Sequence, residues 1–204
     1  MDLGLEGKIT VVTGASKGIG LAIVQQLVAE GAEVVAGARS TGPLNEIEHV
    51  TALSVDLATA DGPRALVAHA IELHGRVDVL VNNVGRAPLR TDGFLAISDA
   101  DFQASMELNF FAAVRAIRAA VADMVTRSDG VIVNVASVNA FFHPDGGVID
   151  YGAAKAHLST SPRPCRRNWA PRGSGSTPSP PARSKRICGS GPKASPQRPP
   201  GWPA

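Results

Sequence analysis

The side chains best suited to chemistry lie near residue 150. Tyr151 and Lys155 are four residues apart, and Ser137 precedes the tyrosine by fourteen residues. On a helix, residues i and i+4 share a face. A phenol ordinarily titrates near pH ~10, but a neighbouring ammonium stabilises its ionised form, and a serine hydroxyl could donate to a carbonyl oxygen as charge develops. Together the three predict acid–base chemistry on a carbonyl or alcohol, although a Tyr-x-x-x-Lys pattern alone is most often incidental.

A second group of residues could bind phosphate. The segment from Thr13 to Gly20 reads Thr-Gly-Ala-Ser-Lys-Gly-Ile-Gly and lies between an apolar run and a helical pattern. Glycines let a backbone approach a pyrophosphate, and the N–H groups at a helix start attract its charge. The spacing is GxxxGxG rather than GxGxxG, so a tight turn without a ligand is the alternative. The candidate phosphate-binding residues are Gly14, Ser16, Lys17, Gly18, Ile19 and Gly20.

If the bound phosphate belongs to a nicotinamide dinucleotide, the choice between NAD and NADP depends on the residue that follows the second predicted strand, residues 33–38. An acidic residue there would bind both ribose hydroxyls, whereas a basic one would accept a 2′-phosphate. Here the chain has Arg39, and Lys17 in the glycine-rich segment offers a second cation. The pattern favours NADP (NADPH) over NAD. The alternative is that both side chains are ordinary solvated surface charges.

Short apolar runs alternate with helical patterns, which is typical of successive βαβ units around a parallel sheet. Ser98 with Asp101 three residues later resembles a capping box that opens a helix reaching about Met124. The pattern stops after Lys155. We therefore predict a Rossmann-like, doubly wound α/β fold with three α/β/α layers, truncated after its fifth strand and the start of the helix that carries Tyr151 and Lys155. The predicted strands are 8–13, 33–38, 51–55, 77–81 and 130–136, and the predicted helices are 18–30, 61–73 and 98–124.

Charge divides the chain at Leu158. Residues 1–158 carry a net charge of −7, and residues 159–204 carry +9 with no Asp or Glu and 11 of the 15 prolines. Such a composition buries too little apolar surface to offset the entropy of ordering. We predict one incomplete dinucleotide-binding domain over 1–158 and a basic Pro/Ser/Arg-rich tail over 159–204 that is disordered or frameshifted. A tail that tethers nucleic acid or an acidic membrane is the weaker alternative, because only Trp169 and Trp202 interleave its cations.

Several other classes of protein are disfavoured. The first residues lack the basic flank and apolar run of a signal peptide, and no apolar segment is long enough to span a membrane. The two cysteines have no CxxC spacing, and the five histidines form no ligand cluster. We expect a cytoplasmic protein with no metal site.

Five motifs in order resemble the short-chain dehydrogenase/reductase family. They are Thr13–Gly20, Asp56-Leu57 after the third strand, Asn82-Asn83-Val84-Gly85 after the fourth, Asn109 in the long helix, and Ser137 with Tyr151 and Lys155. Val84 stands where the family usually has Ala. The resemblance implies an oxidoreductase that transfers hydride between NADPH and a small-molecule carbonyl or secondary alcohol.

The resemblance also implies a role for each motif residue. Tyr151 would be the general acid in reduction and the base in oxidation, Lys155 would lower its pKa and bind the nicotinamide ribose, and Ser137 would polarise the substrate carbonyl. Asn109 would hold a water that links Lys155 to solvent. In the cofactor site, Asp56 and Leu57 would contact adenine and Asn83 the neighbouring ribose, with Gly85 close by. The alternatives are that Asn82 and Asn109 satisfy buried backbone groups and that Asp56 caps a helix.

The chain departs from the family after Leu158. Family members continue the Tyr-Lys helix and add a sixth strand with a Pro-Gly turn, a substrate lid and a seventh strand. When each codon starts one base earlier, serine codons TCN become NTC, which encode Phe, Leu, Ile or Val. The reading across Asn168, Trp169 and Ala170 is then forced to Leu-Gly, and Gly173 to Arg183 can yield Gly-Ile-Arg-Val-Asn-Thr-Val-Thr-Pro-Gly-Pro. We hypothesise that residues from about Ser159 are a frameshifted translation.

Two functions therefore compete: an NADP-dependent oxidoreductase, and a defective or cofactor-binding-only member of the family. Loops 86–97 and 138–150 would border the substrate, with Phe141, Phe142 and His143 as candidate lining residues or as an ordinary surface loop. The substrate itself is not determined by the sequence. Members of the family often form homo-oligomers through the long helix and the Tyr-Lys helix. The resemblance therefore implies that a homo-oligomer is possible here, but the sequence does not determine the oligomeric state.

Overall fold

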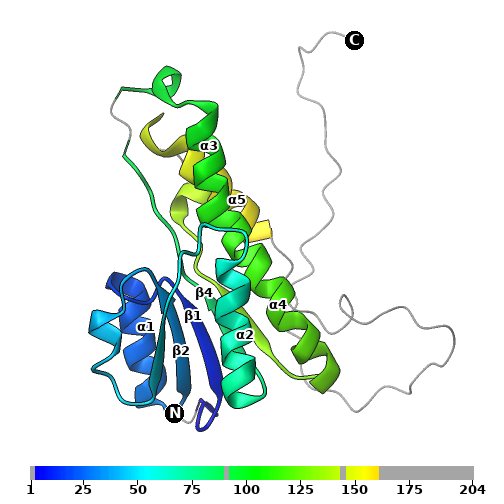
Figure 1. Cartoon of the computed structure of the whole chain (residues 1–204). Helices are drawn as coiled ribbons and strands as arrows, with labels where there is room; N and C mark the ends of the chain where they lie inside the picture. Colours follow the sequence, from blue (N-terminus) through cyan, green and yellow to red (C-terminus); the bar gives the residue numbers. More distant parts are fainter. Residues whose placement is uncertain (1–2, 90–91, 143–145, 161–204) are drawn as a thin grey trace, which may run out of the picture. The chain divides into compact units, whose positions relative to one another are not determined.

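The fold is a five-stranded parallel sheet flanked by helices (Figure 1), and the computed structural model describes residues 3–89, 92–142 and 146–160. The strand order is β3-β2-β1-β4-β5, and every neighbouring pair is parallel. The direction of strand order reverses between β1 and β4, which makes a crevice for ligands at their carboxyl ends. The strands are β1 Ile9–Thr13, β2 Glu33–Ala38, β3 Val50–Ser54, β4 Val79–Asn82 and β5 Val131–Asn134.

Helices cover both faces of the sheet, so the predicted three-layer, Rossmann-like α/β fold is confirmed. Helix α1 packs on one face, while α2 and α4 pack together on the other. The longer helices are α1 Gly18–Ala29, α2 Gly62–His74, α3 Asp99–Met106, α4 Ala112–Arg127 and α5 Ile149–Thr160. The short ones are η1 Gly42–Leu44, η2 Phe94–Ala96, the π-turn η3 Glu107–Phe111, η4 Val138–Ala140 and η5 Gly146–Val148.

The two faces of the sheet bury alternate residues of the same strands. Val11 of β1 lies in the cluster with Leu66 of α2 and Ile117 of α4, whereas Val12 lies in the cluster with Val24 of α1. This alternation follows from the pleat, which points successive side chains to opposite faces. Both faces are apolar because both are covered, which explains why the strands read as continuous apolar runs.

An ion-pair network closes the end of the sheet that lies away from the carboxyl ends of the strands. The buried Asp78 accepts hydrogen bonds from Ile9 N (2.9 Å), Arg76 Nε (2.9 Å) and Arg127 of α4 (3.1 Å). Burial alone would raise the pKa of Asp78, but the bond from Ile9 and the two guanidinium groups hold it below its ordinary value. Arg127 also donates to the Val77 carbonyl, so the last turn of α4 is fixed to the start of β4.

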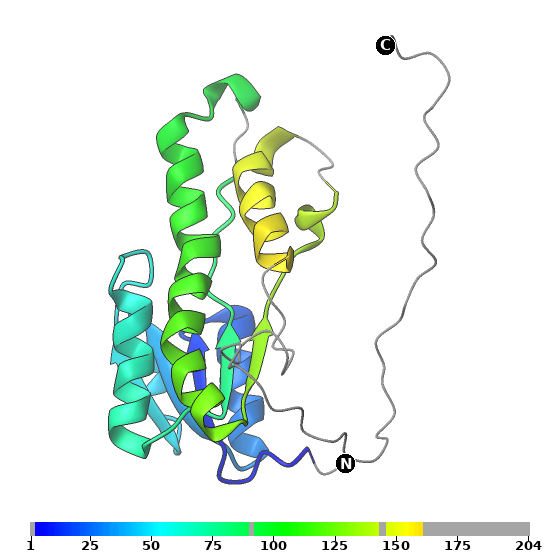
Figure 2. The ribbon, with the colours of Figure 1, turned by 90° about the vertical axis from the view of Figure 1, so that its right-hand side faces the viewer.

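The long helix predicted over 98–124 is present, but it is interrupted by one π-helical turn. Ser98 and Asp101 form the predicted capping box, but α3 and α4 are joined by the π-turn η3 around Asn109. The buried Asn109 side chain donates to the Ser105 carbonyl, four residues earlier, at 3.0 Å. A side chain inserted into the backbone ladder is a recognised cause of such local unwinding. Figure 2 shows α5 lying beside α3, with which it is in contact.

The tail from residue 161 onward and His143 lie outside the described residues, so the expectations for them are not tested. In the described ranges, β5 is an edge strand, and its outward valines Val131 and Val133 are 50% and 44% exposed. No helix in those ranges is long and apolar enough to cross a bilayer. Nor does that part of the chain bring together three or more His, Cys, Asp or Glu side chains for a metal ion.

Candidate active site

The glycine-rich segment forms a tight turn between β1 and α1 at the carboxyl end of the sheet. Gly14 has φ +70°, and a Cβ there would lie 2.7 Å from the Val84 Cα atom. A Cβ on Gly20 would press on the Gly14 carbonyl oxygen and the Asn83 side chain. Only glycine meets both requirements, which leaves the backbone of the turn bare.

Thr13 and Asn83 hold this turn in place. The Thr13 hydroxyl oxygen accepts from the backbone N–H groups of Asn83 (3.0 Å) and Val84 (3.1 Å). The Asn83 side-chain amide donates to the carbonyls of Thr13 (3.1 Å) and Gly14 (2.9 Å). The loop after β4 and the loop after β1 therefore form one unit. This role of Thr13 was not predicted from the sequence, because both partners lie about seventy residues away along the chain. A ribose contact by Asn83 stays a prediction.

The N-terminus of α1 is open to a ligand. Lys17 is its N-cap in an extended conformation, no side chain caps the helix, and its first turn has no acidic residue. The positive end of the helix dipole is therefore uncompensated by any described side chain of the helix. Lys17 and Ile19 are exposed, whereas Gly20 is buried in the turn.

The residues predicted to meet the adenosine half lie after β2 and β3. Arg39 follows β2 and is exposed, and its carbonyl accepts from the Ser54 hydroxyl at 3.2 Å. Asp56 accepts from the Ala58 N–H at 3.0 Å in a local turn, and it does not cap α2, whose N-cap is Asp61. The Leu57 side chain is buried in the core. Neighbouring parallel strands place these residues along one edge of the sheet, while their contacts with adenine stay predictions.

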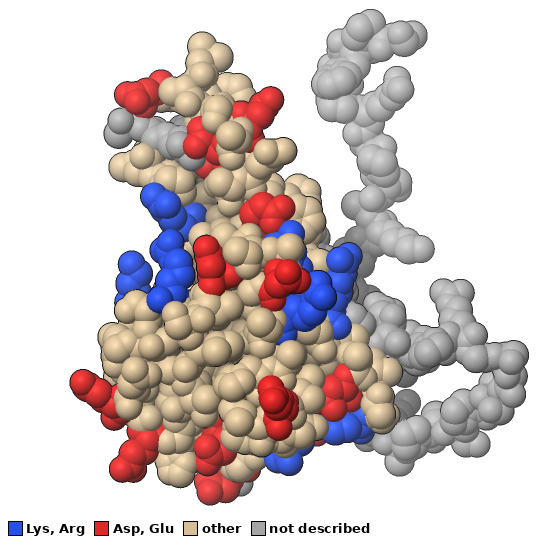
Figure 3. Space-filling view, in the orientation of Figure 1, with Lys and Arg blue, Asp and Glu red and all other residues tan. Residues whose placement is uncertain are grey.

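Figure 3 shows two groups of Lys and Arg side chains near the middle of the view, with acidic side chains between and above them; acidic side chains, with fewer basic ones, also lie at the lower end. Basic side chains near the carboxyl ends of the strands favour the binding of an anionic ligand there.

Lys155 is the centre of the second group of predicted residues. Its side chain is 3% exposed, and its ammonium donates to the Val135 carbonyl at 3.0 Å. The Nζ atom lies 5.9 Å from the centre of the Tyr151 ring on the same helix. Burial lowers the pKa of Lys155 from 10.5 to about 8, because the charged form loses hydration. A cation that water barely reaches thus stands beside the phenol.

Asn109 brings the loop after β4 against this lysine. Its side-chain oxygen accepts from Arg86 N (2.9 Å), and its side-chain nitrogen donates to the Arg86 carbonyl (3.1 Å). A Cβ on Gly85 would lie 2.9 Å from the Asn109 oxygen and 3.3 Å from Lys155 Nζ. Asn109 therefore does satisfy buried backbone groups, as its alternative role required. A bound water between it and Lys155 stays a prediction.

Ser137 begins the short helix η4, which packs against α5. Its hydroxyl oxygen accepts from the Asn139 N–H at 3.2 Å. A hydroxyl that accepts in this way keeps its own O–H to donate elsewhere. The loop that follows carries exposed apolar side chains at Val138, Phe141 and Phe142.

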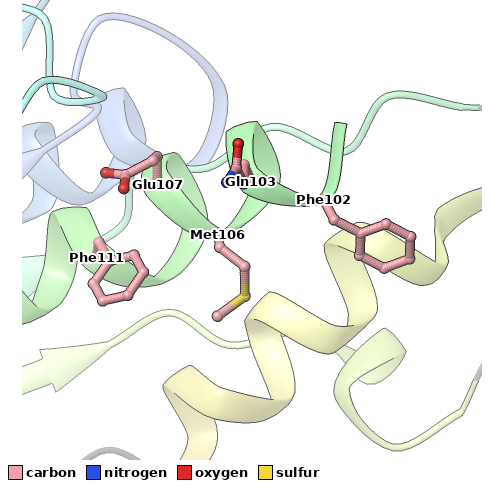
Figure 4. A pocket seen from close by; sticks show the side chains of 5 residues that line it. All are labelled: Phe102, Gln103, Met106, Glu107 and Phe111. Atoms are coloured by element: carbon pink, nitrogen blue, oxygen red, sulfur yellow. The ribbon is translucent and has the colours of Figure 1, made fainter. Parts of the chain in front are cut away.

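A separate surface hollow lies along α3 and η3 (Figure 4). It is lined by Phe102, Gln103, Met106, Glu107 and Phe111. The two phenylalanines and the methionine lie on the side that faces α5, and Glu107 pairs with Arg115 at 2.6 Å. None of the predicted catalytic or cofactor-binding residues lines this hollow.

The parallel sheet, the bare glycine turn and the helix that carries Tyr151 and Lys155 are typical of a nucleotide-binding fold of the Rossmann type. Residues 8–173 match the family model described as short chain dehydrogenase. The chain belongs to the short-chain dehydrogenase/reductase family, whose members are oxidoreductases.

Individual relatives are similar over most of this chain. A fatty acyl-CoA reductase of Mycobacterium tuberculosis is 34% identical over 181 residues, which cover 85% of this chain and 62% of the relative. A short-chain dehydrogenase from Streptomyces avermitilis has a TM-score of 0.71 and 32% identity over 76% of this chain and 58% of its own. A metagenomic short-chain oxidoreductase solved in complex with NADP has a TM-score of 0.70 and 32% identity over 76% of this chain and 73% of its own. The chain thus spans less than two thirds of the length of the first two.

Proposed function

We propose that this chain is an NADP-dependent oxidoreductase that transfers hydride between NADPH and a carbonyl or secondary alcohol. The observation that carries the proposal is the buried Lys155, held beside Tyr151 and against Gly85 and Asn109. Burial lowers the pKa of this ammonium, which means that the charged form is costly for the fold. Such groups with perturbed pKa values concentrate at functional sites.

The residues present fit a dinucleotide. Gly14 and Gly20 sit where a Cβ would press on neighbouring backbone, so the turn is shaped for close approach. The uncapped start of α1 offers N–H groups and a positive dipole end to a pyrophosphate. When bound, NADPH would supply the hydride. Gly14, Ser16, Gly18, Ile19, Gly20, Asp56, Leu57, Asn83 and Gly85 are the residues proposed to hold it, with Tyr151 and Lys155 at its nicotinamide end.

The preference for NADP over NAD rests on charge. Lys17 and Arg39 are both exposed, one at each of two neighbouring strand ends. Arg can grip a phosphate in a bidentate manner, whereas neither residue accepts hydrogen bonds from ribose hydroxyls. The similar metagenomic oxidoreductase was solved with NADP, which supports the same assignment.

The proton would come from Tyr151. The Lys155 ammonium stabilises negative charge on the phenol oxygen, so the phenol can release its proton to the carbonyl oxygen during reduction and recover it during oxidation. The free O–H of Ser137 would donate to the same carbonyl oxygen as it becomes negative. With a pKa of about 8, Lys155 is mostly charged at neutral pH and loses that charge in mild alkali.

The test is turnover of NADPH with a panel of ketones by wild type and Tyr151→Phe. We expect wild-type turnover and a loss of at least about 1,000-fold in the variant, because the proton donor is gone while the ring remains. NADPH fluorescence titration is the control and should give the same affinity for both proteins. Equal turnover by the two proteins would contradict the assignment of Tyr151.

The second candidate function is cofactor binding without turnover. It is favoured by the half-exposed valines Val131 and Val133 of the edge strand β5. The frameshift hypothesis would explain this exposure, since the shifted reading continues the chain with apolar residues. NADPH binding with no turnover of any ketone would support this second function, and the coding sequence from Lys155 to Ser174 would show whether a shifted frame is open.

A further inference from the structure

Asp150 is a buried carboxylate that the proposed mechanism does not use. It lies in the first turn of α5, directly before Tyr151, and is fully buried. Its Oδ2 atom accepts a hydrogen bond from the Ser105 hydroxyl of α3 at 2.6 Å. A buried polar group is costly unless it is hydrogen-bonded, and here the Ser105 hydroxyl supplies a bond to the carboxyl group across two helices.

Ser105 joins this carboxylate to Asn109. The Ser105 hydroxyl donates to Asp150, while its carbonyl accepts from the Asn109 side chain at 3.0 Å. All three residues are at least nine-tenths buried. One short path therefore runs from the first turn of the Tyr-Lys helix, through α3, to the residue that fixes Arg86.

This path sets how α5 sits against the loop after β4. Figures 1 and 2 show α3 and α5 side by side, and the two helices are in contact. Lys155 lies one helical turn beyond Tyr151 and next to Gly85, so a small slide of α5 would change both its burial and its distance from Asn109. Displacements of about 1 Å in an active site can cost on the order of 100-fold in rate.

We propose that Asp150 and Ser105 are positioning residues, which hold the Tyr-Lys helix in register with Asn109 so that Tyr151 and Lys155 meet the substrate in a fixed geometry. The effect on rate rests on the proposed function, whereas the effect on Lys155 does not. Neither residue touches substrate or cofactor in this role.

The experiment compares the full-length wild type with Ser105→Ala, Asp150→Ala, Asp150→Asn and the double variant Ser105→Ala/Asp150→Ala. Asp99→Asn, on the exposed first turn of α3, is the matched control. Three kinds of measurement are made: the kinetics (kcat and KM) with NADPH and a ketone, the thermal midpoint, and the pH profile of acetic anhydride labelling of Lys155 by peptide mass spectrometry. The double variant matters most because it removes both partners of the Ser105–Asp150 hydrogen bond, so neither side chain is left facing a lost partner across that bond.

We expect the double variant to melt near wild type and to lose about 10- to 100-fold in kcat, with the KM for NADPH within about threefold. Its Lys155 labelling midpoint should move from about 8 toward 10.5, because water reaches the ammonium. Asp150→Asn keeps an acceptor oxygen for Ser105 and should recover most of the rate that Asp150→Ala loses.

A double variant with wild-type kcat and a wild-type Lys155 midpoint would overturn the proposal. So would an Asp150→Asn variant as impaired as Asp150→Ala, since the bond would then be irrelevant. If wild type turns over no ketone, the proposed function fails on its own, and the labelling midpoint still decides the role of Asp150 and Ser105.

Discussion

At the scale of single residues, Lys155 shows a trade-off between stability and function: its buried charge costs folding free energy but serves the neighbouring Tyr151. Its ammonium is 3% exposed, and burial lowers its pKa to about 8. The fold thus holds a cation where solvation is poor, and the benefit of that cation falls on the neighbouring phenol. Residues that are useful in a site and costly to the fold are typical of enzymes.

Replacing Lys155 with Met should therefore stabilise the protein at pH 7. Between pH 8 and 10.5 the unfolded chain keeps a proton on Lys155 that the folded chain has released, so this lysine's contribution to stability rises with pH. We expect Lys155→Met to raise Tm by about 3 °C or more at pH 7, less the lost bond to Val135, and the gain to shrink toward pH 10. Thermal melts across this range measure it, with Lys8→Met as the surface control. A lower Tm for Lys155→Met at pH 7 would show that burial does not penalise the charge.

Gly85 offers a second test at the same scale. A methyl group there would lie 2.9 Å from the Asn109 oxygen and 3.3 Å from Lys155 Nζ, so one of them must move. We expect Gly85→Ala to lower kcat/KM by about 10- to 100-fold in the NADPH-ketone assay. Gly42→Ala is the matched control, because no atom lies within 4 Å of the position that its methyl group would take, and it should leave the rate unchanged. Wild-type kinetics in Gly85→Ala would mean that the crowding at Lys155 has no catalytic consequence.

The sequence revealed residues whose partners are near in the chain and missed those whose partners are far. Tyr151 and Lys155 were predictable because a helix places i and i+4 together. The bonds of Thr13 to the backbone after β4 and of Ser105 to Asp150 span 70 and 45 residues, and no local pattern encodes them. Ser105 and Asp150 read as ordinary polar helix positions until the fold buries them.

At the scale of elements, periodicity predicted the order and kind of the five strands and of the longer helices, but neither the short 3-10 helices nor the π-turn between α3 and α4. The 98–124 pattern is helical on both sides of Asn109, and a π-turn shifts the register without breaking the apolar face. Its cause is the tertiary role of Asn109, whose side chain binds Ser105 and Arg86. Strand ends differed from prediction by up to two residues, because an apolar residue continues the pattern beyond the last ladder bond.

The ion-pair network at Asp78 predicts how the free energy of unfolding depends on pH in the acidic range. Asp78→Ala should lower the free energy of unfolding at pH 7 by about 1–3 kcal/mol, because Ile9 N and two arginines lose their acceptor. The pKa of Asp78 lies below its ordinary 3.8, so its contribution is present above that value and is lost as pH falls through the folded pKa. Urea unfolding at pH 7 and near pH 3 measures the difference, which should shrink in acid. Asp129→Ala, an exposed partner of Lys8, is the control and should change stability little at either pH.

At the scale of the whole molecule, charge and composition change at Leu158, whereas the match to the family model runs on to residue 173. All the predicted site residues lie before Leu158 in a segment of net charge −7, whereas residues 159–204 carry +9. The sheet of the described residues has β5 at its edge with half-exposed valines, on a face that helices ordinarily cover in a parallel sheet. An exposed apolar edge strand is a liability for solubility as well as for stability.

The frameshift hypothesis makes a prediction about the whole chain. If residues from about Ser159 are read one base earlier, the product gains an apolar segment, Gly-Ile-Arg-Val-Asn-Thr-Val, that can pair with the edge of β5 and flank Val131 and Val133 on the same face of the sheet. We expect a protein carrying the shifted reading to melt cooperatively at a midpoint at least about 5 °C higher than the 204-residue chain, because two half-exposed valines and a new strand become buried. Calorimetry of both proteins, with NADPH turnover measured alongside, tests this, and a chain cut after Thr160 is the control for removing the basic tail alone. A stop codon in the shifted frame, or equal midpoints for the shifted and cut chains, would remove the hypothesis and leave the basic tail as a genuine part of the protein.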